Sequence, residues 1–176
     1  AGTAYEESLS AAAGPVVVTV VDTTPPPIQF PSAIPSPQNV GGPVNVSAAI
    51  FDNVGVTGAW AEVTDPNTVV LGNFTLTFDP ITGRRYDMRP YSTIGAYGYR
   101  ISARDAQGNW AVATGTFAIA DLEAPSLSAV TASPDPQEVH FPVNVTGVAT
   151  DNVGVTDVYL EVRDPLGGST NVTMSR

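Results

Sequence analysis

The sequence repeats itself at a separation of 99 residues. The tetrapeptide PVNV at residues 43–46 and the hexapeptide DNVGVT at residues 52–57 both return 99 residues later. Aligned at this offset without gaps, residues 22–69 and 121–168 share 21 identities in 48 positions. A match of this length indicates that the chain is built from copies of one folding unit.

The same offset divides the chain into one complete unit and two pieces. The first 21 residues correspond to the end of a unit, and the last 55 or so correspond to its first part. We therefore predict an N-terminal extension with a donor strand at residues 1–21, a complete domain at 22–121 and an incomplete domain at 122–176.

The local patterns predict β-strands rather than helices. Gly and Pro number 16 each, which is typical of a chain with many turns, and no long stretch has an apolar period of 3.6 residues. Within the complete unit, alternation between turn residues predicts seven strands, at 31–37, 44–51, 56–64, 73–78, 85–91, 96–103 and 110–120. Seven short strands in about one hundred residues indicate a β-sandwich.

Four motifs resemble the immunoglobulin-like repeats of prokaryotic cell-surface proteins. They are DTTPP at 22–26, DNVGV at 52–56, YGYRISARDAQGN at 97–109 and a final strand that ends at Asp121. The resemblance implies an all-β fold with immunoglobulin-like β-sandwich domains. It also implies a place in an adhesin, a pilus or a surface layer, or as a spacer in a secreted enzyme, and hence an extracellular location.

Composition excludes several classes of function. The net charge is −10 and all seven basic residues are Arg, so no basic stripe is available to neutralise nucleic-acid phosphates. Cysteine is absent, which excludes disulfides and thiolate metal sites. The apolar run at residues 9–21 is too short to span a membrane. His140 is the only histidine, and no catalytic triad can be assembled around it, so we expect no enzyme.

A calcium site is one interpretation of the acidic residues in the turns. In an immunoglobulin-like sandwich, Asp22, Asp52 and Asp105 lie at the same pole, together with Asn53 and Asn109. Ca²⁺ prefers several oxygen ligands, so these residues are candidate metal ligands. The repeat adds Asp121 and Asp151 as the corresponding candidates of the next unit. The alternative is that these side chains only cap turns.

Four acceptor sequons for N-glycosylation are the second candidate feature. They begin at Asn45, Asn73, Asn144 and Asn171. The first and third are related by the offset of 99, and the other two by an offset of 98. Chance and duplication explain part of this number. Four aromatic residues either line a sugar-binding face or pack in the core: Trp60, Tyr97, Tyr99 and Trp110.

The incomplete domain predicts a missing partner. A half-sandwich leaves an apolar face and an unpaired strand edge in water, which favours aggregation. The N-terminal extension contains a valine-rich segment that corresponds to the last strand of a unit. We therefore predict that this segment of one subunit inserts as a donated strand into residues 122–176 of the next. The donor-strand residues are Val16, Val17, Val18, Val20 and Val21.

Head-to-tail strand donation does not close on itself and produces open filaments. The sequence thus predicts a structural subunit of an extracellular, pilus-like filament that assembles by donor-strand complementation. Two alternatives stay open at this point. The chain is a fragment of a longer immunoglobulin-repeat adhesin or surface-layer protein, or it is a spacer or carbohydrate-binding module of a secreted enzyme. Host or cell-surface glycans are possible partners in these roles.

Overall fold

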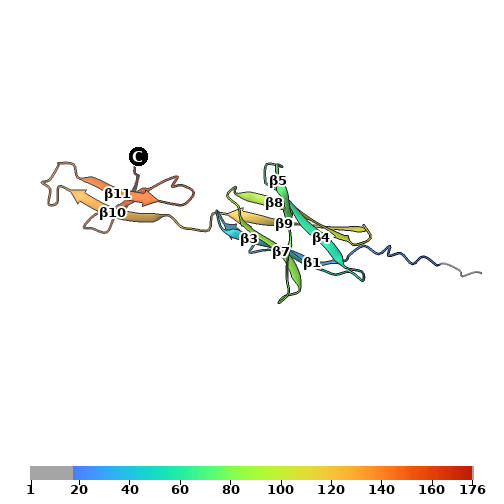
Figure 1. The fold of residues 1–176 in the computed structure, drawn as a ribbon. Helices are drawn as coiled ribbons and strands as arrows, with labels where there is room; N and C mark the ends of the chain where they lie inside the picture. The colour runs from blue at the N-terminus through green and yellow to red at the C-terminus, as the bar shows by residue number, and fades with distance from the viewer. Residues whose placement is uncertain (1–17, 176) are drawn as a thin grey trace, which may run out of the picture.

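The computed structural model describes residues 18–175, and every regular element in this range is a β-strand (Figure 1). Residues 28–120 form a four-stranded sheet in the order β1-β3-β7-β6 and a five-stranded sheet in the order β2-β9-β8-β4-β5. The strands are β1 (Ile28–Ile34), β2 (Gln38–Asn39), β3 (Pro43–Ile50), β4 (Val56–Thr64), β5 (Val70–Thr75), β6 (Thr77–Asp79), β7 (Arg84–Pro90), β8 (Gly95–Asp105) and β9 (Trp110–Ala120). The pairing is antiparallel throughout, except between β2 and β9.

The core of the complete domain lies between these two sheets and follows from strand alternation. Along β4, the small or branched side chains of Ala59, Ala61 and Val63 are fully buried, whereas Trp60 and Glu62 point to the opposite face. The same alternation along β8 buries Ile101 completely. Each sheet therefore contributes one apolar face to a single hydrophobic core.

The predicted strands at 56–64 and 110–120 are confirmed to the residue as β4 and β9. The predicted single strand at 73–78 is wrong, because the chain leaves the five-stranded sheet after Thr75 and joins the four-stranded sheet at Thr77. Leu76 lies at the crossing, only 1% exposed, and its N–H donates to the carbonyl of Ala59 over 2.8 Å. A buried leucine thus lies where the chain passes from one sheet to the other. The alternation of apolar and polar residues does not predict this crossing.

The second repeat forms two hairpins that reproduce the strand pairs of the first. They are β10 (Ser126–Ser133) with β11 (Asn144–Thr150), and β12 (Tyr159–Arg163) with β13 (Ser169–Thr173). The irregularity in β1 returns in β10, where Phe30 and Ala129, 99 residues apart, both have a φ of 50°. The repeat in the sequence is therefore a repeat in backbone conformation.

One local difference explains why the offset changes from 99 to 98 within the second repeat. In the β4–β5 hairpin, Val63 pairs with Gly72 and Thr64 pairs with Val70, so Leu71 forms a bulge. In the β12–β13 hairpin, the corresponding pairs follow one another without a skipped residue. The residue that the second repeat lacks is thus the bulge residue.

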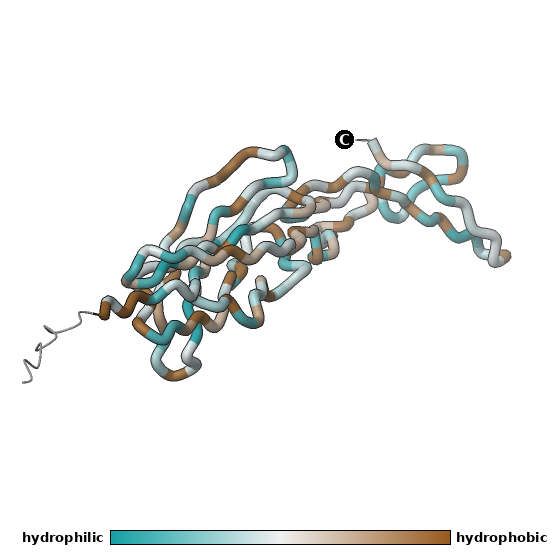
Figure 2. Tube along the Cα trace, turned by 90° about the vertical axis from the view of Figure 1, so that its right-hand side faces the viewer, coloured by the Kyte–Doolittle hydropathy of each residue, from teal (hydrophilic) through white to brown (hydrophobic). Residues whose placement is uncertain are grey.

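The second repeat leaves apolar side chains exposed that are buried in the first. Val44 and Val63 have no exposed surface, whereas their counterparts Val143 and Val162 are 46% and 49% exposed. Figure 2 shows apolar positions along both hairpins. In the complete domain β3 also pairs with β7 and β4 with β8, but β11 and β12 have no such second partner among residues 18–175.

Part of the predicted donor strand, Val16 and Val17, lies outside the described residues. Val18, Val20 and Val21 precede β1 without forming a strand, and each is at least 64% exposed. The corresponding strand of the complete domain, β9, pairs with β8 and β2 and not with β4. Because β12 corresponds to β4, the strand expected to pair with β12 is an equivalent of β8. A segment that corresponds to β9 would pair with that strand and not with β12 itself.

We expect Ile101→Ala to destabilise the complete domain by about 2–5 kcal/mol, because the substitution leaves a cavity in a fully buried site. Both tryptophans of the chain lie in β4 and β9, so urea unfolding followed by tryptophan fluorescence reports on this domain alone. Ile81→Ala is the matched control, because Ile81 is 94% exposed. Equal unfolding midpoints for the two variants would contradict the assignment of the core.

Candidate functional site

Three carboxylates from distant parts of the sequence meet at one pole of the complete domain. Asp22 precedes β1, Asp52 opens the turn between β3 and β4, and Asp105 ends β8. One oxygen from each side chain lies within 4.8 Å of the other two. Within residues 18–175, this is the single group of three or more acidic, histidine or cysteine side chains close enough to share a metal ion.

Asp105 is the buried member of the acidic cluster, with 1% of its surface exposed. Its Oδ1 accepts hydrogen bonds from the backbone N–H groups of Gln107 and Asn109, and its Oδ2 accepts one from Asn109 Nδ2 at 2.7 Å. Burial raises the pKa of Asp105, but these hydrogen bonds outweigh burial and hold the pKa below its ordinary value. Asp105 is therefore ionised at neutral pH.

Asp22 and Asp52 use one oxygen each and leave the other without a partner. Asp52 Oδ1 accepts from the N–H groups of Val54 and Gly55, and Asp22 Oδ1 accepts from the N–H of Thr24. The Oδ2 atoms of both residues are shielded from solvent and have no hydrogen-bond partner. Buried carboxylate oxygens without donors are unfavourable unless a cation is near. The donor set, made of oxygen atoms alone, fits Ca²⁺.

The two asparagines of the cluster act as hydrogen-bond donors that connect its parts. Asn53 Nδ2 donates to Asp22 Oδ1 at 3.3 Å, and Asn109 Nδ2 donates to the Asp22 carbonyl at 3.2 Å. The segment that leads into β1 is thus attached to both loops at this pole. Asp22 and Asp52 thus cap turns through Oδ1, as the alternative interpretation predicts, whereas the calcium interpretation stays a prediction.

The second repeat reproduces two members of the cluster. Asp121 Oδ1 accepts from the N–H of Glu123, and Asp151 Oδ1 accepts from the N–H groups of Val153 and Gly154 at 2.8 Å. These backbone hydrogen bonds lower the pKa of Asp151, and its Oδ2 is also shielded without a partner. The offset of 99 places the counterpart of Asp105 beyond residue 176.

The four aromatic residues divide between the core and the surface. Tyr97 and Tyr99 are buried, and the Tyr97 hydroxyl donates to the Thr93 carbonyl at 3.0 Å. Trp60 and Trp110 lie on the outer face of the five-stranded sheet with ring centroids 5.6 Å apart. Sequence reasoning left these roles open. The sequence signal that places Trp60 on the surface is its alternation along β4 with Ala59 and Ala61, which face the core.

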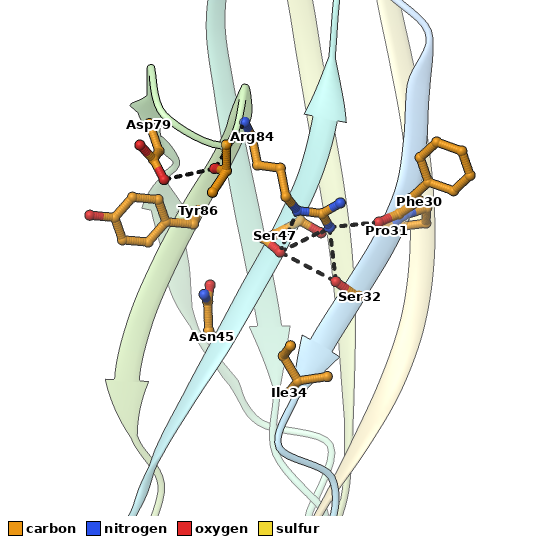
Figure 3. A pocket seen from close by; sticks show the side chains of 10 residues that line it. Phe30, Pro31, Ser32, Ile34, Asn45, Ser47, Asp79, Arg84 and Tyr86 are labelled. Atoms are coloured by element: carbon orange, nitrogen blue, oxygen red, sulfur yellow. Dashed lines mark hydrogen bonds between the residues drawn. The ribbon is translucent and has the colours of Figure 1, made fainter.

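The hollow in Figure 3, about 650 Å³ in volume, lies on the outer face of the four-stranded sheet. From β7, Arg84 reaches across β3 to β1, where its Nη2 donates to the Phe30 carbonyl at 2.8 Å and to Ser32 Oγ at 2.9 Å. Its Nε donates to Ser47 Oγ on the way. Arg84 therefore braces three strands beside the irregularity in β1, and sequence reasoning did not identify it.

The sequon asparagines differ in accessibility. Asn73 lies exposed on β5, at the edge of the five-stranded sheet, and Asn171 occupies the same place on β13. Asn45 is half-buried on the central strand β3 with its Oδ1 shielded, whereas Asn144 is exposed at the start of β11. Asn73 and Asn171 are thus the acceptors that the fold presents most openly.

His140 lies exposed in the loop between β10 and β11. No helix in residues 18–175 is long and apolar enough to cross a membrane. Compared with known proteins, the sequence matches no family model and no curated protein.

We expect the stability of the complete domain to fall as the pH falls below about 4, the ordinary pKa of an aspartate in an unfolded chain. The folded-state pKa of Asp105 is lowered, so its contribution is present above the unfolded pKa and is lost as the pH falls through the folded pKa. Asp105→Asn should flatten this part of the profile, measured as urea midpoints from pH 7 to pH 2. An unchanged profile in the variant would contradict this role.

Proposed function

We propose that the chain is a structural, non-enzymatic part of an extracellular immunoglobulin-like repeat protein at a cell surface, with Ca²⁺ bound where the chain enters each domain. The acidic cluster carries this proposal. It lies where the segment before β1 meets two loops at one pole, and two of its three carboxylates, Asp22 and Asp52, have counterparts 99 residues later.

The strand orders support the immunoglobulin-like assignment. Immunoglobulin-like sandwiches pair strands A-B-E-D in one sheet and G-F-C in the other. Here β1-β3-β7-β6 has the first order, and β9-β8-β4 has the second. The absence of cysteine means that no disulfide joins the two sheets, which pack together over one hydrophobic core.

The position of the cluster supports a role at a domain junction. In Figure 1 the chain reaches β1 at one end of the sandwich and continues to β10 beyond the other end. Asp22 therefore lies between the preceding segment and the domain body. Without a cation, three carboxylates within 4.8 Å repel one another. A bound Ca²⁺ would neutralise them and fix the direction in which the chain enters.

We expect Ca²⁺ to raise the melting temperature of the complete domain, because a ligand that binds only the folded state stabilises it, by about 2.7 kcal/mol at 100 times the dissociation constant. Calorimetry with Ca²⁺ and with a chelator measures this shift. Asp52→Asn should abolish most of it, since an amide oxygen can still accept from Val54 and Gly55 while the charge is lost.

Asp65→Asn is the matched control for this experiment. Asp65 also caps a turn, with Oδ1 accepting from the N–H groups of Asn67 and Val69, but it lies at the opposite end of β4. Its variant should keep the full Ca²⁺ shift. A melting temperature that Ca²⁺ leaves unchanged in the unsubstituted chain would remove the cation from the proposal.

Strand donation is a second candidate function, and the open edges of β11 and β12 favour it. A strand beside β12 would take the place that β8 has beside β4, and one beside β11 would take the place of β7. The exposed valines at 18, 20 and 21 precede a folded domain and have no strand partner in the described chain. In a head-to-tail filament, this segment would pair with the β12 edge of the next copy in the place of β8, although by sequence it corresponds to β9.

We expect a strand-donating chain to form polymers that size-exclusion chromatography and electron microscopy detect. Deleting residues 1–21 should abolish the polymers, whereas deleting residues 1–14, which keeps all five donor valines, should not. A monodisperse monomer that resists heating, or normal assembly after the larger deletion, would exclude strand donation and leave the repeat-array role unaffected.

A further inference from the structure

The outer face of the five-stranded sheet carries a pair of neighbouring tryptophans, Trp60 and Trp110, and the Arg104 guanidinium lies over the Trp110 ring at 5.8 Å from its centroid. Trp110, on β9, is 52% exposed, and its ring is inclined by 31° to that of Trp60 on β4. Between them on β8, Ser102 pairs with Trp60 on one side and with Val112 on the other. A half-buried and an exposed tryptophan side by side on the outer face of a sheet indicate a surface that binds a ligand.

The aromatic pair forms one side of a hollow of about 560 Å³ that combines apolar and polar groups. It is lined by Trp60, Asn73, Arg100, Ser102, Trp110 and Val112. A ligand that suits it has an apolar face for the indoles and a rim of polar groups for the guanidinium, hydroxyl and amide. A pyranose ring has this character, with C–H groups on one face and hydroxyls around its edge.

The fold itself places a sugar acceptor beside this hollow. Asn73 begins the sequon Asn73-Phe74-Thr75 on the exposed edge strand β5. Thr75 pairs directly with Trp60, and Asn73 pairs with Glu62, so all four side chains belong to the outer face. Trp60 and Asn73 are diagonal neighbours, about 7–8 Å apart at the backbone, a separation that an aromatic side chain can bridge.

The second repeat retains part of this arrangement. Tyr159 stands where the first repeat has Trp60, and it pairs with Thr173 of the sequon that begins at Asn171. Asn171 in turn pairs with Glu161. The juxtaposition of an outward aromatic residue and a sequon is therefore present twice, although the two hairpins differ in length by one residue.

We propose that Asn73 carries an N-linked glycan whose first sugars pack on Trp60 and Trp110 and hydrogen-bond to Arg100 and Ser102. A lipid-linked oligosaccharide phosphate is the required co-reactant. Asn73 Nδ2 bonds to the anomeric carbon, the bond from that carbon to the donor phosphate breaks, and the amide proton leaves with the lipid phosphate. The inference depends on the extracellular location in the proposed function but not on the cation site.

The test is secretion of the whole chain from a host that N-glycosylates Asn-x-Ser/Thr sequons, with peptide mapping by mass spectrometry. Thr75→Ser keeps the sequon and Thr75→Ala removes it, so the two form a matched pair at one position. We expect a glycan at Asn73 in the first only. That glycan should raise the melting temperature of the complete domain by a few degrees and change the tryptophan emission.

The contact with the aromatic pair is tested by repeating the comparison in Trp60→Ala and in the milder Trp110→Leu. The glycan should still be attached, but its melting-temperature increment should be lost. A measurement without any substitution is endoglycosidase trimming of the secreted chain to one sugar, which should lower the melting temperature and shift the emission back towards that of Thr75→Ala.

Three results would overturn the proposal. The first is an unmodified Asn73 in a chain whose other sequons carry glycans. The second is a glycan-induced increase in melting temperature that persists in Trp60→Ala or in Trp110→Leu. The third has two parts. The unglycosylated chain binds free N-glycan oligosaccharides and loses this binding on Trp110→Leu, while a glycan attached at Asn73 changes neither the melting temperature nor the tryptophan emission. That last result would assign the face to glycans of another molecule.

Discussion

Strand β8 is the element on which the rest of the complete domain depends. It pairs with β4 on one side and with β9 on the other, and its inward side chains include the fully buried Ile101. The two repeats show what this neighbour does, since Val63 and Val162 are identical in sequence but 0% and 49% exposed. Burial here is a property of the partner strands and not of the local sequence.

The same strand connects the core to the acidic cluster. Asp105 is the last residue of β8, and the hydrogen bonds of its loop fix Asn109, which donates to the carbonyl of Asp22. The acidic cluster is therefore complete only when the sandwich is closed and the segment before β1 is docked. A cation at this pole would stabilise the fold of one domain and the direction of the segment before it in a single binding event.

The sequence predicted the repeat, the β-sandwich layers and two strands to the residue, because period-2 alternation and turn residues are local signals. It also brought Asp22, Asp52 and Asp105 together, through the repeat and the expected fold. It did not predict the crossing at Leu76 or the brace formed by Arg84, because both depend on contacts between sheets or across strands. The sequence also did not predict which carboxylate oxygens of the acidic cluster lack a hydrogen-bond donor, because this depends on the folded loops.

The change of offset from 99 to 98 is another feature that strand pairing explains and local sequence does not. A one-residue change in a strand normally turns every following side chain to the other face. Here the missing residue is the bulge at Leu71, so the pairing of aromatic residue and sequon is retained in the β12–β13 hairpin. The two repeats then present an aromatic residue and a sequon on corresponding faces. In the proposed repeat array, glycans at these sequons would shield the sides and leave the poles free for the junctions between domains.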